Sequence, residues 1–210
     1  MTGTEILAHT RALIQEKSAK YFLDTQLLIF LNNAVKKWAA KMNTSNNMYY
    51  FDTDTITHTV GTRTISLPAD ATGTIFGIEA SDGSGLYEKP FNEFYKADEG
   101  QATWFALVGM NLYLDTLATI EKTYTLYHFR KPTGINVEQG TEVDFPVMHH
   151  ELIGYEAAIV ASIRRKDEHS DLIREREMLI RSFNESLGDQ VMGAPMSIPD
   201  HSAIYAGGHD

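Results

Sequence analysis

The strongest helical pattern in the sequence begins at Val147, directly after Asp144-Phe145-Pro146, and runs to about Leu187. Apolar residues recur along it at helical spacing: Leu152, Ile159 and Ile163, then Leu172, Leu179, Phe183 and Leu187. Such a stretch must bury its apolar face, because helices in water gain most of their stability from tertiary packing. The partner that covers this face therefore constrains the fold of the whole chain.

Two further helical patterns lie at the N-terminus. The first is expected from Thr4, as its cap, to about Lys17, with an apolar stripe formed by Ile6, Leu7, Leu13 and Ile14. The second is expected from Asp24 or Thr25 to about Met42, and one of its faces carries Leu28, Leu31, Val35 and Trp38. We expect these helices to pack against the C-terminal stretch, because the residues between them follow a different pattern.

From Met48 the apolar period changes from that of a helix to that of a strand. Residues 53–60 and 63–68 are predicted to form a β-hairpin around Gly61-Thr62. Further strands are expected on both sides of two glycine turns and before the second helical region, at 74–80, 86–89, 104–108, 111–114 and 123–130. A short helix is expected at 92–97, with Asn92 as its cap.

Together these patterns predict an α+β fold. Residues 1–46 and 147–187 are expected to form a helical bundle, residues 47–146 an inserted antiparallel β domain, and residues 188–210 an extended C-terminal arm. Glycine and proline interrupt the arm, yet it carries the apolar residues Met192, Met196, Ile198, Ile204 and Tyr205. This composition is typical of a segment that becomes ordered on a partner.

Acidic residues are concentrated in the middle of the chain, which has a formal net charge of -10. Residues 42–150 carry six bases and fourteen acids, whereas residues 1–41 carry six bases and three acids. A general nucleic-acid binder presents a basic face to phosphates, so this balance argues against that class. It is compatible with a protein past which DNA moves without binding.

The sequence predicts no disulfide, thiolate metal site or cysteine nucleophile, because cysteine is absent. The first residues lack the pattern of a secretory signal. The most apolar window, residues 21–35, is too short and too polar to span a bilayer. We therefore expect a protein that is made in the cytoplasm and does not enter a membrane.

No catalytic, metal or cofactor site is predicted. The best candidate metal cluster is His149-His150-Glu151 with Glu156, but adjacent helical residues point about 100° apart, so a polar first turn explains them better. Asp52 and Asp54 share a strand face that could hold a hard cation, and an exposed acidic face is the simpler interpretation.

Two other function classes remain open at this point. Glu138 and Glu142 lie in one loop and could be the acids of a hydrolase that acts on carbohydrate or peptidoglycan. A β-rich binding module for a small molecule would instead need a closed apolar pocket. Met48-Tyr49-Tyr50-Phe51 cannot all point inward on an alternating strand, so Tyr49 and Tyr50 are expected in an exposed aromatic patch.

The order of the elements resembles a known family. Its features here are Leu-Asn-Asn-Ala-Val at 31–35, a hairpin ending Ile65-Ser66-Leu67-Pro68, the strand 124–129 followed by Lys131-Pro132, and Asp144-Phe145-Pro146 before a helix rich in Ala and Ile. They are similar to the head-to-tail adaptor, or connector, proteins of tailed bacteriophages, including the tail tubular protein A-like group. The similarity covers about residues 4–187.

The resemblance implies a structural virion protein of the head–tail junction, with no cofactor and no enzymatic activity. Such adaptors form a ring, usually dodecameric, between the portal protein and a tail nozzle or tube protein, and DNA passes through the lumen. The isolated protein can still be a monomer. The resemblance directs the C-terminal arm, through Met192, Met196, Ile198, Ile204 and Tyr205, to the portal, and the β region with Tyr49 and Tyr50 to the tail. On the polar face of the C-terminal helices, the residues expected to meet neighbouring subunits are Arg164, Arg165, Arg174 and Arg176.

Overall fold

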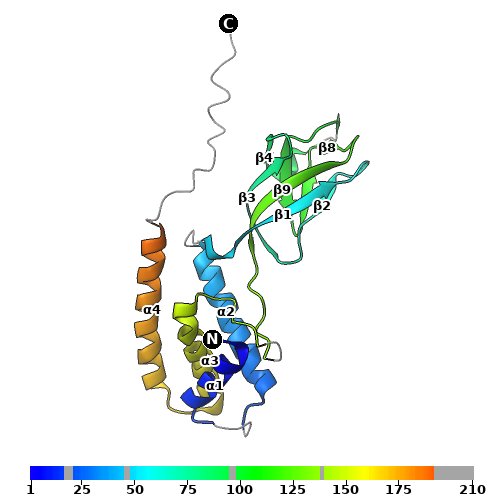
Figure 1. Ribbon diagram of the computed structural model, residues 1–210. Coiled ribbons are helices and arrows are strands. Elements are labelled where there is room, and N and C mark those ends of the chain that lie inside the picture. The colour runs from blue at the N-terminus through cyan, green and yellow to red at the C-terminus, as the bar shows by residue number, and fades with distance from the viewer. Residues whose placement is uncertain (17–20, 45–47, 95–97, 138–139, 192–210) are drawn as a thin grey trace.

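A computed structural model of the chain describes residues 1–16, 21–44, 48–94, 98–137 and 140–191. Within these residues the fold is mixed α+β, with four α-helices and a seven-stranded, largely antiparallel sheet. Helices from both chain ends pack together, and the sheet projects from one end of the bundle (Figure 1). The predicted fold class is therefore confirmed, whereas the arm from residue 192 onward lies outside the described residues.

The N-terminal helices are α1, Gly3–Leu13, and α2, Asp24–Thr44. The cap of α1 is Thr2 and not the predicted Thr4. The Thr2 hydroxyl accepts from the backbone N–H of Glu5 at 3.3 Å, and the Glu5 carboxylate accepts from the backbone N–H of Thr2 at 2.7 Å. This reciprocal pair satisfies two donors at the helix end, which Thr4 could not do from inside the first turn.

The C-terminal helices are α3, His150–Arg165, and α4, Ser170–Val191, preceded by the 3-10 helix η3, Val147–His149. The predicted break between them is confirmed. Lys166 takes the left-handed conformation at φ 61°, and its N–H donates to the carbonyl of Ile163 at 3.1 Å, which ends α3. No helix in the described part of the chain has the length and apolar character needed to cross a membrane.

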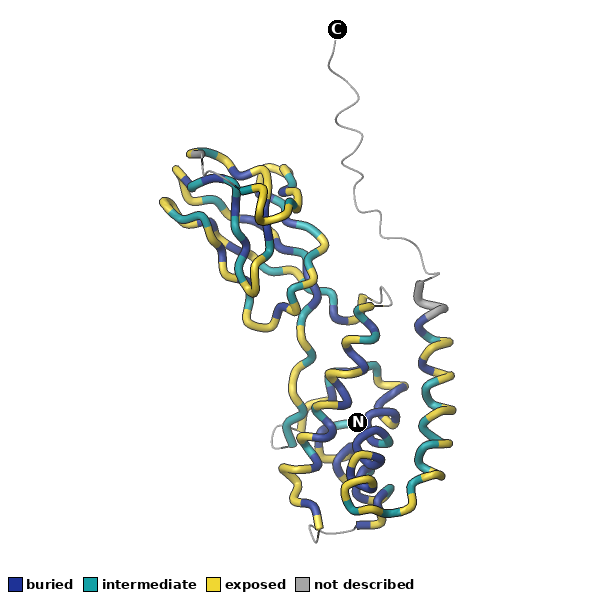
Figure 2. The backbone as a smooth tube through the Cα atoms, turned by 180° about the vertical axis from the view of Figure 1, so that it is seen from behind, coloured by how far each residue is buried: buried dark blue, intermediate teal, exposed yellow. Residues whose placement is uncertain are grey.

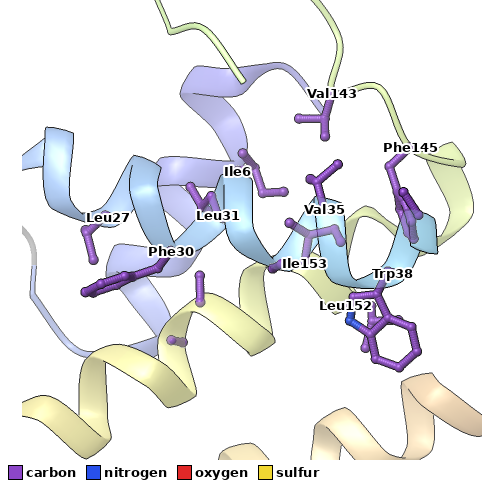
Figure 3. Packing of buried hydrophobic residues seen from close by; sticks show 14 of the residues in the cluster. Ile6, Leu27, Phe30, Leu31, Val35, Trp38, Val143, Phe145, Leu152 and Ile153 are labelled. Atoms are coloured by element: carbon purple, nitrogen blue, oxygen red, sulfur yellow. The ribbon is translucent and has the colours of Figure 1, made fainter. Parts of the chain in front are cut away.

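One hydrophobic cluster joins all four helices. Figure 3 shows Ile6 of α1, Val35 of α2 and Ile153 of α3 gathered in it, all of them almost completely buried. α3 can approach α1 closely because position 154 is glycine: a Cβ there would lie 2.7 Å from the ring of His9. Ile163, expected on the apolar face, is 54% exposed, because it lies off the face that carries Ile153.

α4 lies along the outside of the bundle (Figures 1 and 2), so only one of its faces is covered. Phe183 is the fully buried anchor of that face. Its ring centroid lies 5.2 Å from that of Trp38 on α2 and 5.8 Å from that of Phe145, which precedes η3. These three aromatic rings join α4 to the packing between helices of the two chain ends, which α3 makes with α1 and α2.

The β part is a curled sheet with the strand order β1-β9-β3-β4-β6-β7-β2. Its strands are β1 (Phe51–His58), β2 (Thr64–Ser66), β3 (Ala71–Ala80), β4 (Gly85–Glu88), β6 (Trp104–Val108), β7 (Asn111–Leu114) and β9 (Lys122–Arg130). A separate short pair is formed by β5 (Asp98–Glu99) and β8 (Thr116–Leu117). The inner face of the sheet buries a second cluster, centred on Leu112, Leu114 and Leu126.

The predicted hairpin of residues 53–60 with 63–68 is wrong. β1 pairs over its whole length with β9, and β2 pairs with β7. β1 and β2 are the two ends of the strand order, and they contact each other although no ladder joins them within the described residues. The turn was recognisable from local residues, but the partner of β1 lies far along the chain, where no local signal points.

The other predicted strands are confirmed: β6 and β7 have the predicted bounds, and the ends of β3, β4 and β9 are shifted. β3 and β4 pair around Gly83, at φ 82°, and β6 and β7 pair around Gly109, at φ 64°. β4 and β6 run parallel, so the sheet is not purely antiparallel as expected. In place of the helix at 92–97 the structure has a 3-10 helix, η2, at Phe91–Glu93, which contains Asn92 and has no side-chain cap; residues 95–97 lie outside the described residues.

Replacing the anchor of α4 should destabilise the protein strongly. We expect Phe183→Ala to lower the free energy of unfolding by about 3–5 kcal/mol, because it leaves a cavity between α2, α4 and Phe145. Met178→Ala is the matched control on the same helix, since Met178 is 50% exposed, and it should cost less than about 1 kcal/mol. Urea denaturation of both variants measures this, and equal losses would contradict the assignment of Phe183 as the anchor.

Candidate functional site and assembly surfaces

Two chain crossings, residues 48–51 and 130–146, join the helical and β parts, and we call this region the neck. Arg130, the last residue of β9, makes a two-point contact with the Asp144 carboxylate: Nη1 lies 2.6 Å from Oδ2 and Nη2 lies 3.1 Å from Oδ1. The backbone N–H of Thr133 donates to Oδ2 at 2.7 Å. From the other crossing, the Tyr50 hydroxyl donates to the backbone carbonyl of Asp144 at 2.6 Å. Asp144 therefore ties both crossings together and fixes how the β part leaves the bundle.

The charges of the neck follow from these contacts. Burial alone would raise the pKa of Asp144, but the hydrogen bonds from Arg130 and Thr133 outweigh burial and hold that pKa below its usual value. The same carboxylate raises the pKa of the Arg130 guanidinium. Burial raises the pKa of Tyr50 far above its usual range, so its hydroxyl stays a neutral donor.

The predicted exposure of Tyr50 is wrong. The residue is fully buried and belongs to the helical cluster, because a 3-10 helix, η1 (Met48–Tyr50), and not a strand carries it. Tyr49 is 42% exposed, and its ring packs edge-on against Tyr50 with a centroid distance of 4.9 Å. A contact between Tyr49 and a tail protein stays a prediction.

Other aromatic side chains, which sequence reasoning did not single out as exposed, lie on the outer face of the β part. Tyr87 and Trp104 are about 40% exposed and face each other across the parallel pair β4–β6, with centroids 5.5 Å apart. Phe76 is exposed because β3 has a bulge there: Ile75 and Gly77 pair with consecutive residues of β9, so Phe76 is left over. Gly77 within a strand pattern was the available signal for that bulge.

The four arginines expected at a subunit interface differ in their exposure and in their contacts within the chain. Arg165 pairs with Asp167 and donates to the backbone carbonyl of Ile14 at 2.9 Å, which links α3 to the end of α1. Arg176 lies 3.5 Å from the buried Glu156 and so links α4 to α3. Both side chains serve contacts within the chain.

Arg164 and Arg174 are the exposed members of the set. The Arg164 guanidinium lies 4.6 Å from the centroid of the Phe30 ring, a cation–π contact that holds it beside α2. Arg174 makes no ion pair within the described part of the chain. Whether either meets a neighbouring subunit stays a prediction.

His149 and His150 are buried and hydrogen-bonded. The Ser186 hydroxyl donates to the Phe183 carbonyl, so it accepts from His149 Nε2, 2.8 Å away. His150 Nε2 donates to the Phe145 carbonyl at 2.7 Å, which leaves Nδ1 to accept from the terminal ammonium of Met1 at 2.6 Å. Burial lowers the pKa of both histidines, so both are neutral near pH 7.

The other residues proposed for metal binding are also used in contacts or exposed. Asp54 Oδ2 lies 2.8 Å from His128 Nε2, and Asp52 lies 3.7 Å from Arg130. Glu156 binds Lys37 at 2.9 Å, and Glu151 is exposed. In the residues that the structure describes, no group of three or more histidines and acids is placed to hold a metal ion.

The two alternative functions, a hydrolase and a small-molecule binding module, each required a particular feature: a pair of loop carboxylates or an apolar pocket. Glu142 is exposed and its backbone bridges to Thr2, whereas Glu138 lies outside the described residues. A cavity of about 470 Å³ lies where β1, β8 and β9 end, and Lys122 and Asp82 on its wall pair at 3.1 Å. With charged residues in its wall, it is not the apolar pocket that a ligand-binding module would need.

The five arm residues assigned to the portal all lie outside the described residues: Met192, Met196, Ile198, Ile204 and Tyr205.

Comparison with known protein families gives a match over most of the chain. The family model described as SU10 adaptor protein matches residues 1–199, so the match includes the helical bundle, the neck and the β part. No curated protein matches the chain.

Neutralising Asp144 should loosen the neck. Asp144→Asn keeps the size of the side chain but removes the charge that Arg130 contacts, and we expect a loss of about 1–3 kcal/mol in the free energy of unfolding. Asp70→Asn is the control at an exposed carboxylate without an ion pair in the described residues, and it should change stability by about 0.5 kcal/mol or less. Thermal and urea unfolding measure both, and an unchanged Asp144→Asn variant would show that the contact does not stabilise the fold.

Stability should also fall in mild acid. The folded-state pKa of His149 and His150 is lowered, so below the unfolded-state pKa of about 6.5 the unfolded chain binds more protons than the folded chain. We therefore expect the free energy of unfolding to be constant above that pH and to decrease as the pH falls below about 6.5. A His149→Gln/His150→Gln variant should show a flatter slope over this interval, and an unchanged slope would assign the effect to other groups.

Proposed function

The chain belongs to the SU10 adaptor protein family, a family of phage head-to-tail adaptors, and we propose that it works as a ring-forming subunit between the portal and the tail of the virion. In this proposal several copies surround a lumen through which DNA passes. The observation that carries the proposal is the family match over residues 1–199, which includes every described element. The protein is on this basis a component of the phage particle.

The charge distribution supports a conduit for DNA. Fourteen acids and six bases in residues 42–150 give the β region a negative charge, which repels phosphates. A lumen that bound DNA tightly would slow its passage, because each phosphate contact adds to the affinity. We assign no enzymatic activity, cofactor or metal to the protein, in line with the structural role of its family.

We assign separate surfaces to the partners. The arm, with Met192, Met196, Ile198, Ile204 and Tyr205, is the contact to the portal, and the β part, with Tyr49 and the exposed aromatic residues Tyr87 and Trp104, is the contact to a tail nozzle or tube protein. Residues 1–46 with 147–187, and residues 47–146, act as two domains. The two separate hydrophobic clusters support this division, and the neck joins them.

Between subunits we assign the contact to Arg164 and Arg174, which leaves out the two arginines that bind within the chain. Both are exposed, and a neighbouring acidic surface would pair with them. The isolated protein is expected to be a monomer that assembles on the portal, because a few exposed charge pairs alone give little affinity.

Mixing the purified protein with its portal and imaging the complex by electron microscopy tests the proposal. We expect rings of the protein on the portal, and no rings with a variant that lacks residues 189–210. Circular dichroism of the shortened variant controls for folding. Unchanged portal binding by the folded, shortened variant would refute the assignment of the arm, and absence of any complex with the full chain would refute the adaptor role.

Charge reversal tests the subunit contact in the same assay. Arg164→Glu/Arg174→Glu should reduce the fraction of complete rings about tenfold, because it places like charges at an acidic neighbour. Lys36→Glu and Lys131→Glu in one variant make the same change of charge at exposed positions of α2 and of the neck, and should leave ring formation unchanged. Equal effects of the two variants would mean that net charge, and not this surface, controls assembly.

A further inference from the structure

Two adjacent apolar side chains on η3 are unusually exposed. Val147 is 65% exposed and Met148 is 73% exposed, which makes them the most exposed large apolar residues of the helical part that the structure describes. We call them the η3 apolar pair. An exposed apolar pair at one place often marks a contact, whereas single exposed apolar residues need no explanation.

The residues on both sides of the pair are held firmly against the end of α4. Phe145, which is labelled in Figure 3, stacks on Phe183 with an interplanar angle of 18°. His149 packs edge-on against the same Phe183 at 5.0 Å and hydrogen-bonds Ser186. The η3 apolar pair therefore lies beside the last turns of α4, on a segment that these contacts hold on both sides.

The chain beyond α4 starts next to this pair. Met192 is only six positions after Ser186, and Met196 is ten positions after it. Even a fully extended chain spans at most about 3.6 Å per residue, so Met192 stays within about 22 Å of the Ser186–His149 contact. Such a short tether keeps the first arm residues at an effective concentration in the millimolar range around the pair, far above that of a second copy in dilute solution.

The chemistry of these arm residues fits the pair. Met192, Met196 and Ile198 are apolar, and the flexible thioether of methionine adapts to irregular apolar surfaces. Gly193 and Pro195 are residues at which helices commonly end and the chain can change direction. No lysine or arginine follows Gly188, so docking would not bury a basic side chain.

We propose that residues 192–198 fold back and dock on Val147 and Met148 of the same chain. This contact covers the apolar pair in the isolated protein. It also occupies Met192, Met196 and Ile198, three of the residues assigned above to the portal. If that assignment holds, the portal must compete with the η3 apolar pair for the arm, and the self-docked arm keeps the free subunit from exposing both apolar surfaces. This last consequence rests on the proposed function, whereas the docking itself does not.

Disulfide trapping tests the docking directly, because the chain contains no cysteine of its own. In the full chain, Met148→Cys/Met196→Cys should form an intrachain disulfide under mild oxidation at least about tenfold faster than Ile120→Cys/Met196→Cys. Ile120 is a matched control, since it is 71% exposed but lies in the β part. Equal rates for the two pairs would overturn the proposal, and so would disulfides formed mainly between chains, which would identify a second copy as the occupant.

Methionine oxidation tests the docking of the arm independently, in a chain without introduced cysteines. Covered Met148 should react slowly with peroxide in the wild-type chain, and Met196→Asp/Ile198→Asp should raise its rate at least about threefold. Met178, 50% exposed on α4, reports in the same mass spectra and should not change. An unchanged rate at Met148 would overturn the proposal. Because no portal is present in either experiment, these negative results would leave the adaptor role untouched.

Discussion

Burial of the apolar faces of α2, α3 and α4 in one cluster is the constraint on which the rest of the structure depends. Phe183 brings α4 onto Trp38 of α2 and onto Phe145, so helices from both chain ends share one core. α2 ends and α3 begins at the same end of the bundle as a result (Figure 1). The chain must therefore leave the bundle after α2 and return to it before α3 at neighbouring points. For this reason two adjacent crossings, residues 48–51 and 130–146, connect the β part to the bundle.

The contacts of the neck fix the orientation of the β part relative to the helical bundle. Without them, the two crossings would be two flexible linkers. Here Tyr50 and Phe129 extend the helical core into the base of the β part, and Asp144 binds Arg130 from one crossing and Tyr50 from the other. The pair is only partly exposed, with 15% of the Asp144 side chain accessible, so water screens it less than an ion pair on the surface.

The charged side chains divide into those used within the chain and those left for partners. Arg165, Arg176 and Glu156 link helices to one another, and Asp54 pairs with His128 inside the β part. The remaining exposed acids give the β part its negative field, and long-range repulsion of phosphates needs no specific contact. Under the proposed function, apolar and aromatic side chains would recognise the portal and the tail, and binding to DNA would stay weak.

The sequence by itself determined the elements whose signals are local. The period of apolar residues located α2, the break between α3 and α4, and most strands, because side-chain burial on one face repeats with the geometry of the element. Glycine marked the turns at Gly83 and Gly109, where φ is positive. The order of these elements also carried the resemblance to phage adaptors.

Only the tertiary structure decided which strands pair and which exposed groups are free. β1 pairs with β9 and not with β2, which follows it in the sequence. The stability of a strand pair depends on side chains of both strands, and a short stretch of sequence contains only one of them. Tyr50 is buried and Arg165 and Arg176 are bound within the chain, for the same reason: their partners Asp144, Ile14 and Glu156 are distant in sequence. Conversely, the pattern of apolar and polar residues around Val147 and Met148 gives no sign that these two side chains are exposed. Their exposure follows from the anchoring of Phe145 and His149 on α4, which turns the side chains of Val147 and Met148 away from the core.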